Sequence, residues 1–286
     1  MSGTFWLRLV KGVRRLRQRP DWAQFADPDW PEQIMRVPVT DDFHAKQGRT
    51  TGRWVLHNAG NTLVVYLKRH YRLPCWRGIL ATLWPGGGWS PALQEWRNLN
   101  RASSLGLPVP RPVAAAEYIG PWCQLQSFLA VEELNDMVPL HEAVPEAAKR
   151  LDASAFQRWK EGLILEVARL TRWLHDGRYF HKDLYLCHFY IPRRLLVPTA
   201  TWRGEVYLID LHRFGRHPLF WRRWQIKDLA QLLFSSDIDG IDDRDRLCFW
   251  RAYRGRRNHR LSTTFLRALV LLKYRQYRRH NAAKAA

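Results

Sequence analysis

The hydrophobic pattern of this chain changes at a polar segment in its middle, Glu133-Leu134-Asn135-Asp136. Before this segment, short runs rich in Val, Tyr and Leu are separated by turn residues, which predicts β-strands. After it, apolar residues recur at helical spacing, most clearly over Ala155–His175. We therefore expect an α+β fold with two lobes: an N-terminal antiparallel sheet carrying one helix, then a mostly helical C-terminal lobe with a hinge between them.

The pattern also predicts individual elements and domain boundaries. The expected strands are one ending near Lys46, then 53–57, 63–70, 113–118, 123–132, 189–191 and 206–209. The expected helices cover 91–104, with Ser90 as N-cap, and 155–175, 226–235 and 265–278. We divide the chain into a basic amphipathic segment at 1–36, an N-lobe at 37–134, and a C-lobe at 135–286 that ends in a basic helix.

The net charge of +20 is concentrated at the two ends of the chain. Residues 1–20 hold six Lys and Arg, residues 251–280 hold ten, and neither segment contains an acid. Such ends are typical of proteins that contact an anionic surface, whether lipid head groups, phosphorylated glycolipid or nucleic acid. The four cysteines form no CxxC pair, so we expect neither a zinc site nor disulfides, and the compartment is expected to be reducing.

We expect a cytosolic protein with peripheral membrane attachment. No stretch approaches the roughly 18 consecutive apolar residues of a membrane-spanning helix, and the start of the chain is too interrupted by charge for a signal peptide. Phe5, Leu9, Val13 and Leu16 recur at helical spacing between Arg and Lys, which predicts a helix over 5–16 that lies in a membrane interface. The alternative interpretation is a helix that docks on the protein's own core.

The strongest chemical signal is the run His181-Lys182-Asp183-Leu184-Tyr185-Leu186-Cys187-His188. Phosphoryl transfer needs a residue that orients the acceptor hydroxyl, oxygens that bind metal, and cations near the phosphates. The run matches the kinase catalytic loop H-R-D-L-x-x-x-N, with His188 in place of Asn. Asp183 is therefore predicted to orient the acceptor hydroxyl or to accept its proton.

A second signal is Leu208-Ile209-Asp210, a hydrophobic strand that ends in an aspartate where kinases carry D-F-G. Asp210 is predicted to hold Mg²⁺ against the phosphates of the nucleotide. An aspartate at the end of a strand is alternatively a turn or cap residue. The preceding catalytic-loop motif favours the metal role.

Upstream, Val64-Val65-Tyr66-Leu67-Lys68 resembles the V-A-I-K strand whose lysine contacts the nucleotide's phosphates. Glu95 is predicted to form the ion pair that a buried lysine needs. Gly48 and Gly52, within Gln47–Arg53, are predicted to cover the phosphates with their backbone N–H groups. The alternatives are a surface lysine on an edge strand and an ordinary hairpin turn.

His188 and Asp228 each have more than one interpretation in the sequence. Kinases usually offer an amide oxygen at the position of His188, and imidazole is a poorer ligand for Mg²⁺. His188 is predicted to bind metal or nucleotide, with an orienting contact to a phosphate or to Asp210 and a structural core histidine as alternatives. Asp228 is predicted to brace the backbone of the catalytic loop, with helix capping as the alternative.

With these residues in place, the chain resembles the lipopolysaccharide kinase family, which includes the Kdo and core-heptose kinases and carries an H-x-D-x-x-x-C-H-F signature. Here the signature is His181–Phe189, and the resemblance covers roughly residues 37–235. It implies a protein-kinase-like fold in which Lys68, Asp183 and Asp210 match the family's nucleotide-site lysine, catalytic aspartate and metal aspartate. It also implies ATP and Mg²⁺ as cofactors, and a sugar hydroxyl of the lipopolysaccharide core as acceptor at the cytoplasmic face of the inner membrane.

Other functions remain open at this stage. Seventeen residues separate Asp210 from Asp228 without an A-P-E run, which leaves little room for the segment on which protein kinases dock peptides. A sugar or another small hydroxyl acceptor is therefore favoured. The alternatives are a kinase of a soluble small molecule or protein, a non-catalytic kinase-like binding module, and a nucleic-acid-binding protein whose aromatic residues stack on bases.

Overall fold

The structure is a computed structural model that describes residues 2–40, 48–255 and 260–285. The described chain divides into two compact units, Met1–Leu134 (unit 1) and Asn135–Ala286 (unit 2). None of the helices in the described ranges is long and apolar enough to cross a bilayer.

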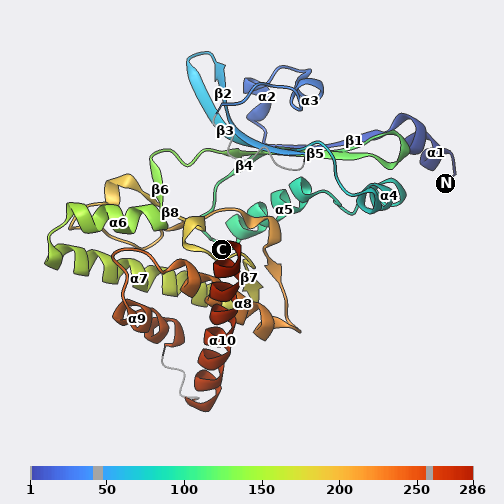
Figure 1. The fold of residues 1–286 in the computed structure, drawn as a ribbon. Coiled ribbons are helices and arrows are strands. Elements are labelled where there is room, and N and C mark those ends of the chain that lie inside the picture. The colour runs from blue at the N-terminus through green and yellow to red at the C-terminus, as the bar shows by residue number, and fades with distance from the viewer. Residues whose placement is uncertain (1, 41–47, 256–259, 286) are drawn as a thin grey trace. The chain divides into compact units, whose positions relative to one another are not determined.

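Within the described residues, unit 1 is built on a five-stranded antiparallel sheet of order β1-β4-β5-β3-β2 (Figure 1). Its strands are β1 (Val13–Gln18), β2 (Arg49–Asn58), β3 (Asn61–His70), β4 (Pro112–Ile119) and β5 (Leu125–Glu132). Its helices are α1 (Ser2–Lys11), α2 (Trp22–Phe25), α3 (Trp30–Gln33), α4 (Cys75–Leu83) and α5 (Pro91–Ser104), with the 3-10 turn η1 (Pro121–Cys123) between β4 and β5.

Local sequence explains the turns and the helix start that were predicted. Ala59 and Gly60 both have positive φ, 45° and 83°, and close the tight hairpin between β2 and β3. The hydroxyl of Ser90 accepts a hydrogen bond from the N–H of Leu93 at 3.3 Å, so the N-cap of α5 is confirmed. The predicted hairpin between β4 and β5 is confirmed as well.

An aromatic core lies between the sheet and the short helices α2 and α3, which cover one of its faces (Figure 1). Trp22 is fully buried, and its ring packs edge-on against Trp30 at 5.6 Å and Trp54 at 5.9 Å. Trp30 in turn packs edge-on against Phe128 of β5 at 5.6 Å. Helix α5 packs against β4 and β5 from the other face, so the sheet is buried on both sides.

The predicted helix over 5–16 is wrong in its second half. Helix α1 ends at Lys11, and Val13 and Leu16 belong to β1, which pairs with β4 from Val13 opposite Ile119 onward. Residues 1–36 are therefore not a separate segment, because β1 completes one edge of the unit 1 sheet. The open edge of β4 offers backbone partners that the local helical pattern does not reveal.

Two further differences concern unit 1. Helix α4 was not predicted, because the prolines and glycines around it read as a loop. The strand predicted to end near Lys46 falls partly on residues 41–47, which lie outside the described ranges. Just before them, Thr40 forms an isolated β-bridge with Arg53.

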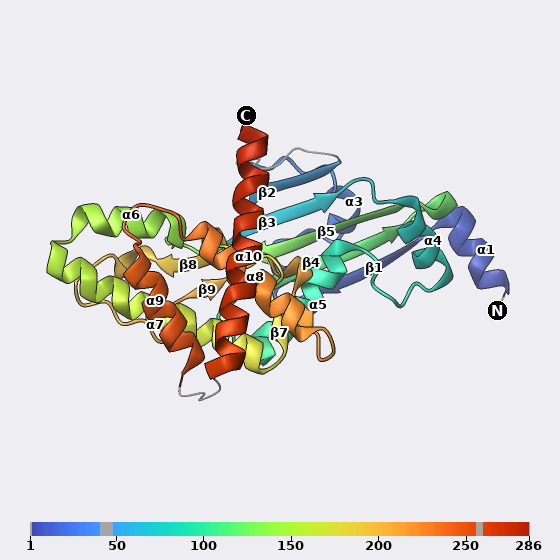
Figure 2. The ribbon, with the colours of Figure 1, turned by 60° about the horizontal axis from the view of Figure 1, so that its bottom comes forward.

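Unit 2 is mostly helical, as predicted (Figure 2). Its helices are α6 (Leu140–Arg150), α7 (Ala153–Asp176), α8 (Trp221–Ser235), α9 (Asp243–Arg254) and α10 (Arg260–Ala285). Its short strands are β6 (Met137–Pro139), β7 (Tyr179–Phe180), β8 (Phe189–Pro192), β9 (Tyr207–Leu208) and β10 (Gly215–Arg216), which pair as β6-β8-β9 and β10-β7. Its 3-10 turns are η2 (Leu186–His188), η3 (Arg193–Leu195) and η4 (Leu211–Arg213).

Helix packing forms the core of unit 2. Figures 1 and 2 show α9 along α7 and α10 beside α8. Ala168 of α7, Leu229 of α8 and Tyr253 of α9 share one buried cluster with Leu266 and Val270 of α10. The predicted helices within α7, α8 and α10 are confirmed, whereas α6 and α9 were not predicted. The C-terminal basic helix therefore contributes to the core of the unit.

Candidate active site

The catalytic-loop motif is held in place by a buried carboxylate. Asp228, in the middle of α8, is fully buried, and its oxygens accept hydrogen bonds from the N–H groups of His181 at 2.9 Å and Lys182 at 2.8 Å. Hydrogen bonds to an ionised acceptor are roughly twice as strong as neutral ones. The predicted bracing contact is therefore confirmed, and the alternative of helix capping does not apply to a residue inside the helix.

The same face of α8 holds the rest of the loop. The side-chain oxygen of Gln231 accepts from the N–H of Leu184 at 3.2 Å, and the hydroxyl of Ser235 accepts from the N–H of Leu186 at 2.9 Å. Residues three and four apart on a helix lie on one face. Polar residues at this spacing thus satisfy a series of loop N–H groups that would be costly to bury unpaired.

Lys182 and Asp210 adopt the left-handed backbone conformation, with φ of 67° and 60°. This conformation costs about 1–2 kcal/mol in a residue with a side chain. Such strain persists where the surroundings over-determine the backbone. Here the bonds to Asp228 fix the first of these residues, and the imidazole of His181 contacts the carbonyl oxygen of Ile209 at 2.9 Å, directly before the second.

His181 is a structural group rather than a proton-transfer group. Its side chain is fully buried, and burial lowers the pKa of His181 from its ordinary value. The neutral imidazole donates its Nε2 proton to the carbonyl of Ile209. The contact ties the catalytic loop to the strand that leads into Asp210.

Asp183 lies among positive and hydrogen-bonding groups. Its carboxylate is 3.2 Å from the Arg213 guanidinium, 3.5 Å from the Lys227 ammonium and 3.2 Å from the amide nitrogen of Gln231. Partial burial favours the neutral acid, but the charges of Lys227 and Arg213 and the Gln231 hydrogen bond outweigh it and lower the pKa of Asp183. Asp183 is therefore ionised at neutral pH.

Asp210 lies close to two histidines. The Nδ1 atom of His212 is 3.1 Å from Asp210 Oδ1, and its Nε2 atom is 3.8 Å from Asp183 Oδ2, so one imidazole links the two carboxylates. His188 Nδ1 contacts the backbone oxygen of Asp183 at 2.6 Å, and its Nε2 lies 3.9 Å from Asp210 Oδ2. Unit 2 therefore brings together all three residues predicted for its part of the site.

Two opposing effects act on the pKa of His188. Burial of the imidazole opposes protonation, but the side chain of Cys187 and the backbone oxygen of Asp183 outweigh it and raise the pKa of His188. Since Nδ1 donates to that backbone oxygen, the tautomer is fixed and Nε2 is directed toward Asp210.

The predicted nucleotide-site lysine lies in unit 1. Lys68 on β3 forms an ion pair with Glu95 on α5 at 2.7 Å, and both side chains are mostly buried, at 15% and 6% exposure. The predicted Lys68–Glu95 pair is therefore present. It lies on the face of the sheet that α5 covers.

The predicted phosphate-covering loop is wrong in its extent. Strand β2 begins at Arg49, so Gly52 lies within a strand, where a Cβ atom would come within 2.4 Å of Val39. Gly48 directly precedes the strand with φ of 74°. The nucleotide-binding role of both glycines stays a prediction.

Four residues around Asp183 and Asp210 were missed in the sequence: His212, Arg213, Lys227 and Gln231. The available signal was their position, since His212 and Arg213 lie two and three residues after Asp210, and Lys227 and Gln231 lie one residue before and three residues after Asp228. The contacts of Lys227 and Gln231 arise only when α8 packs beneath the loop, and those of His212 and Arg213 only when η4 lies beside Asp183, which no local pattern specifies.

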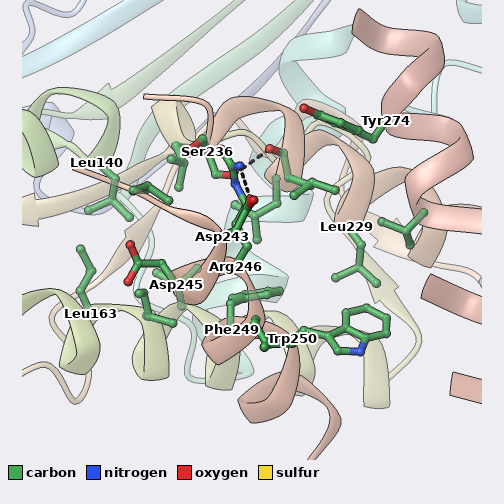
Figure 3. Close-up of a pocket in the computed structure, with 18 of the residues that line it drawn as sticks. Leu140, Leu163, Leu229, Ser236, Asp243, Asp245, Arg246, Phe249, Trp250 and Tyr274 are labelled. Carbon is green, nitrogen blue, oxygen red and sulfur yellow. Dashed lines mark hydrogen bonds and ion pairs between the residues drawn. The ribbon is translucent and has the colours of Figure 1, made fainter. Parts of the chain in front are cut away.

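Unit 2 also contains an apolar cavity of about 510 Å³ (Figure 3). Its walls are mainly aliphatic and aromatic side chains from α6 to α10, such as Leu163, Leu229 and Phe249. Two ion pairs lie at its edge: Lys160 with Asp245 at 2.6 Å, and Arg246 with Asp243 at 2.8 Å.

The model of the lipopolysaccharide kinase (Kdo/WaaP) family matches residues 41–253 of this chain. The chain belongs to this family. The predicted family is thus confirmed, and the signature His181–Phe189 lies within the matched region.

Curated relatives in the lipopolysaccharide kinase family have two names. The chain is 33% identical over 162 residues to the lipopolysaccharide core heptose(I) kinase WaaP of Pseudomonas aeruginosa, covering 57% of this chain and 59% of that protein. It is 26% identical over 254 residues to the 3-deoxy-D-manno-octulosonic acid kinase of Xylella fastidiosa strain M23, covering 84% and 86%. The match to the heptose kinase therefore spans about three fifths of that relative's length.

A solved structure supports the fold assignment. The chain matches a structure described as WaaP in complex with acyl carrier protein, with 28% identity and a TM-score of 0.67, over 93% of this chain and 98% of that one. The predicted α+β, protein-kinase-like fold is confirmed.

We predict that Asp228→Asn lowers the free energy of unfolding by about 1–3 kcal/mol, because an amide group leaves one of the two buried loop N–H groups without an acceptor. Urea unfolding and hydrogen exchange of the loop amides measure this effect. Asp243→Asn is the matched control, since that side chain is 94% exposed, and it should change stability by less than about 0.5 kcal/mol. Equal stability and equal loop protection in the two variants would contradict the assigned role.

Proposed function

We propose that this protein is an ATP-dependent kinase that phosphorylates a sugar hydroxyl, of Kdo or heptose, in the inner core of lipopolysaccharide. The observation that carries the proposal is the position of Asp183, ionised within the family signature and surrounded by Arg213 and Lys227. The names of the relatives, a heptose kinase and a Kdo kinase, support both sugars as candidate acceptors.

In this proposal Asp183 orients the acceptor hydroxyl and takes up its proton. A carboxylate whose pKa is lowered remains in the accepting form at neutral pH. Arg213 and Lys227 place positive charge beside Asp183, where the transferred phosphoryl group needs its charge stabilised. Lys68, oriented by Glu95, contacts the phosphates of ATP, and the segment that holds Gly48 and Gly52 covers them.

The residues around Asp210 fit Mg²⁺. No group of three or more His, Cys, Asp or Glu side chains among the described residues is arranged to hold a metal by itself. Mg²⁺ is ordinarily held by one or two carboxylates together with water and substrate phosphates, so Asp210 is a suitable ligand. His188 Nε2, facing Asp210, either joins it or orients a phosphate. When bound, Mg²⁺ would offset charge on the phosphates of the nucleotide.

We further infer a peripheral location on the inner face of the cytoplasmic membrane. A lipopolysaccharide acceptor is anchored in a membrane by its lipid, and the chain carries a net charge of +20. Anionic lipid surfaces attract basic proteins by about 1 kcal/mol for each Lys or Arg near the surface.

We predict that the wild type transfers phosphate from ATP to purified lipopolysaccharide core lacking that phosphate, and that Asp210→Ala lowers the rate by more than about 100-fold. Asp243→Ala, an exposed carboxylate on α9, is the control and should retain the wild-type rate. The measurement is phosphate incorporation into core acceptors, free sugars and a generic protein substrate. Transfer to protein alone, or transfer unaffected by Asp210→Ala, would refute the proposal.

A second candidate function is binding of an acyl carrier protein, and the apolar cavity of unit 2 favours it. The structural relative is described as a complex with such a protein. Ligand pockets of about 300–1,000 Å³ with apolar walls suit small apolar groups, and this cavity measures about 510 Å³. We propose that the cavity takes the acyl chain of the carrier.

We predict that Leu271→Trp weakens binding of acylated carrier protein by roughly tenfold or more, because the larger side chain occupies the cavity that Leu271 lines. Leu272→Trp is the matched control, since the neighbouring side chain is 55% exposed and does not line the cavity. Isothermal titration with acylated and unacylated carrier measures the effect. Equal binding of both carrier forms, or equal loss in both variants, would contradict an acyl site in the cavity.

A further inference from the structure

Unit 1 exposes a group of large apolar side chains at one end of its sheet. They come from α1, from α4 with its C-cap residue, and from η1, with exposed fractions between 44% and 72%. Among the described residues this tryptophan face consists of Trp6, Leu7, Val10, Trp76, Ile79, Leu83, Trp84 and Trp122. Figures 1 and 2 both show α1 and α4 side by side at this end. Soluble proteins rarely expose a contiguous apolar surface of this kind without an interaction partner.

The core of unit 1 is packed without the side chains of the tryptophan face. Helix α4 already buries its inner face through Gly78, Ala81 and Thr82. A Cβ atom at Gly78 would lie 1.7 Å from the backbone oxygen of Cys123, so glycine is required for α4 to pack directly on η1. Ala81 packs with Ile119 and Leu125 at the ends of β4 and β5. The elements are therefore fixed, and the outward side chains are presented on a rigid support.

The outward side of α4 has its own helical pattern. Trp76, Ile79 and Leu83 are spaced three and four residues apart and are all exposed. Apolar residues at this spacing form a continuous stripe on a helix. Helix α4 is thus apolar on both its buried side and its exposed side, which indicates a partner for the second side.

The segments that form the tryptophan face carry charge of a single sign. Residues 1–20, 59–94 and 118–131 contain no Asp or Glu, whereas Arg8, Lys11 and Arg77 lie within α1 and α4. The guanidinium of Arg77 lies over the ring of Trp76, 5.1 Å from its centroid. Protein interfaces usually have a rim of mixed polar and charged groups. An aromatic face whose own segments carry cations and no acids instead complements an anionic, partly apolar surface.

We propose that the tryptophan face is the surface by which this protein binds an anionic phospholipid bilayer. Tryptophan favours the boundary between head groups and acyl chains, and adjacent Arg and Lys contact the lipid phosphates. The proposal rests on the proposed function only in that a lipid-anchored acceptor gives membrane binding its purpose. It replaces the predicted interfacial helix over 5–16 with a surface built from three separate segments.

Vesicle co-sedimentation with purified full-length protein tests the proposal. The wild type should bind vesicles of phosphatidylglycerol and phosphatidylcholine more tightly than pure phosphatidylcholine. Trp76→Ser/Trp84→Ser should bind both at least about tenfold more weakly, because apolar area is lost. Arg8→Gln/Lys11→Gln/Arg77→Gln should lose roughly 100-fold on the anionic vesicles alone. Trp173→Ser/Phe265→Ser, which removes exposed aromatics of unit 2, is the matched control and should bind like the wild type.

Phosphate transfer to core oligosaccharide freed of its lipid separates this proposal from the proposed function. The face variants should retain that transfer while losing vesicle binding. Vesicle binding that depends on the face in a protein without kinase activity would support the bilayer surface and refute only the kinase. The bilayer surface is overturned if the wild type does not bind vesicles, if the tryptophan variant binds as tightly as the control, or if the variant instead abolishes self-association with vesicle binding unchanged.

Discussion

The chemistry of unit 2 depends on one buried interaction, the carboxylate of Asp228 accepting the N–H groups of His181 and Lys182. It holds Lys182 in a left-handed conformation that is unfavourable by itself, and it thereby fixes the direction of the next residue, Asp183. His181, held by the same carboxylate, contacts the carbonyl before Asp210. One group on α8 therefore positions both proposed catalytic carboxylates, Asp183 for the acceptor hydroxyl and Asp210 for Mg²⁺.

Positively charged and hydrogen-bonding groups surround these carboxylates. Two carboxylates in one site ordinarily raise one another's pKa. Here Arg213 and Lys227 act on Asp183, and the imidazole of His212 lies between Asp183 and Asp210. In unit 1 the same principle applies to Lys68, whose buried ammonium is compensated by Glu95. Each proposed reacting charge thus has a specific partner.

Local spacing in the sequence identified some candidate residues and some elements of the fold. Asp183, Asp210 and Lys68 became candidates because strand and loop motifs place them at fixed distances along the chain, and their roles stay predictions. Helices α5 and α7 were predicted because their periodicity, and the N-cap of α5, are local. Lys227 and Gln231 were missed because their contacts form only when α8 packs under the loop, and Arg213 because its contact forms only when η4 lies beside Asp183. The helix predicted over 5–16 failed for a similar reason: pairing of Val13–Gln18 with β4 joins residues about a hundred positions apart.

The central claim is that Asp183 acts on the acceptor hydroxyl rather than on the nucleotide. Its most direct test is a single-turnover measurement of phosphoryl transfer to lipopolysaccharide core by Asp183→Asn, with ATP affinity measured on the same preparation. The account predicts that the rate of transfer falls roughly 10²–10⁴-fold while the affinity for ATP changes by less than about threefold. Transfer at the wild-type rate, or a loss of ATP binding that accounts for the lost transfer, would contradict it.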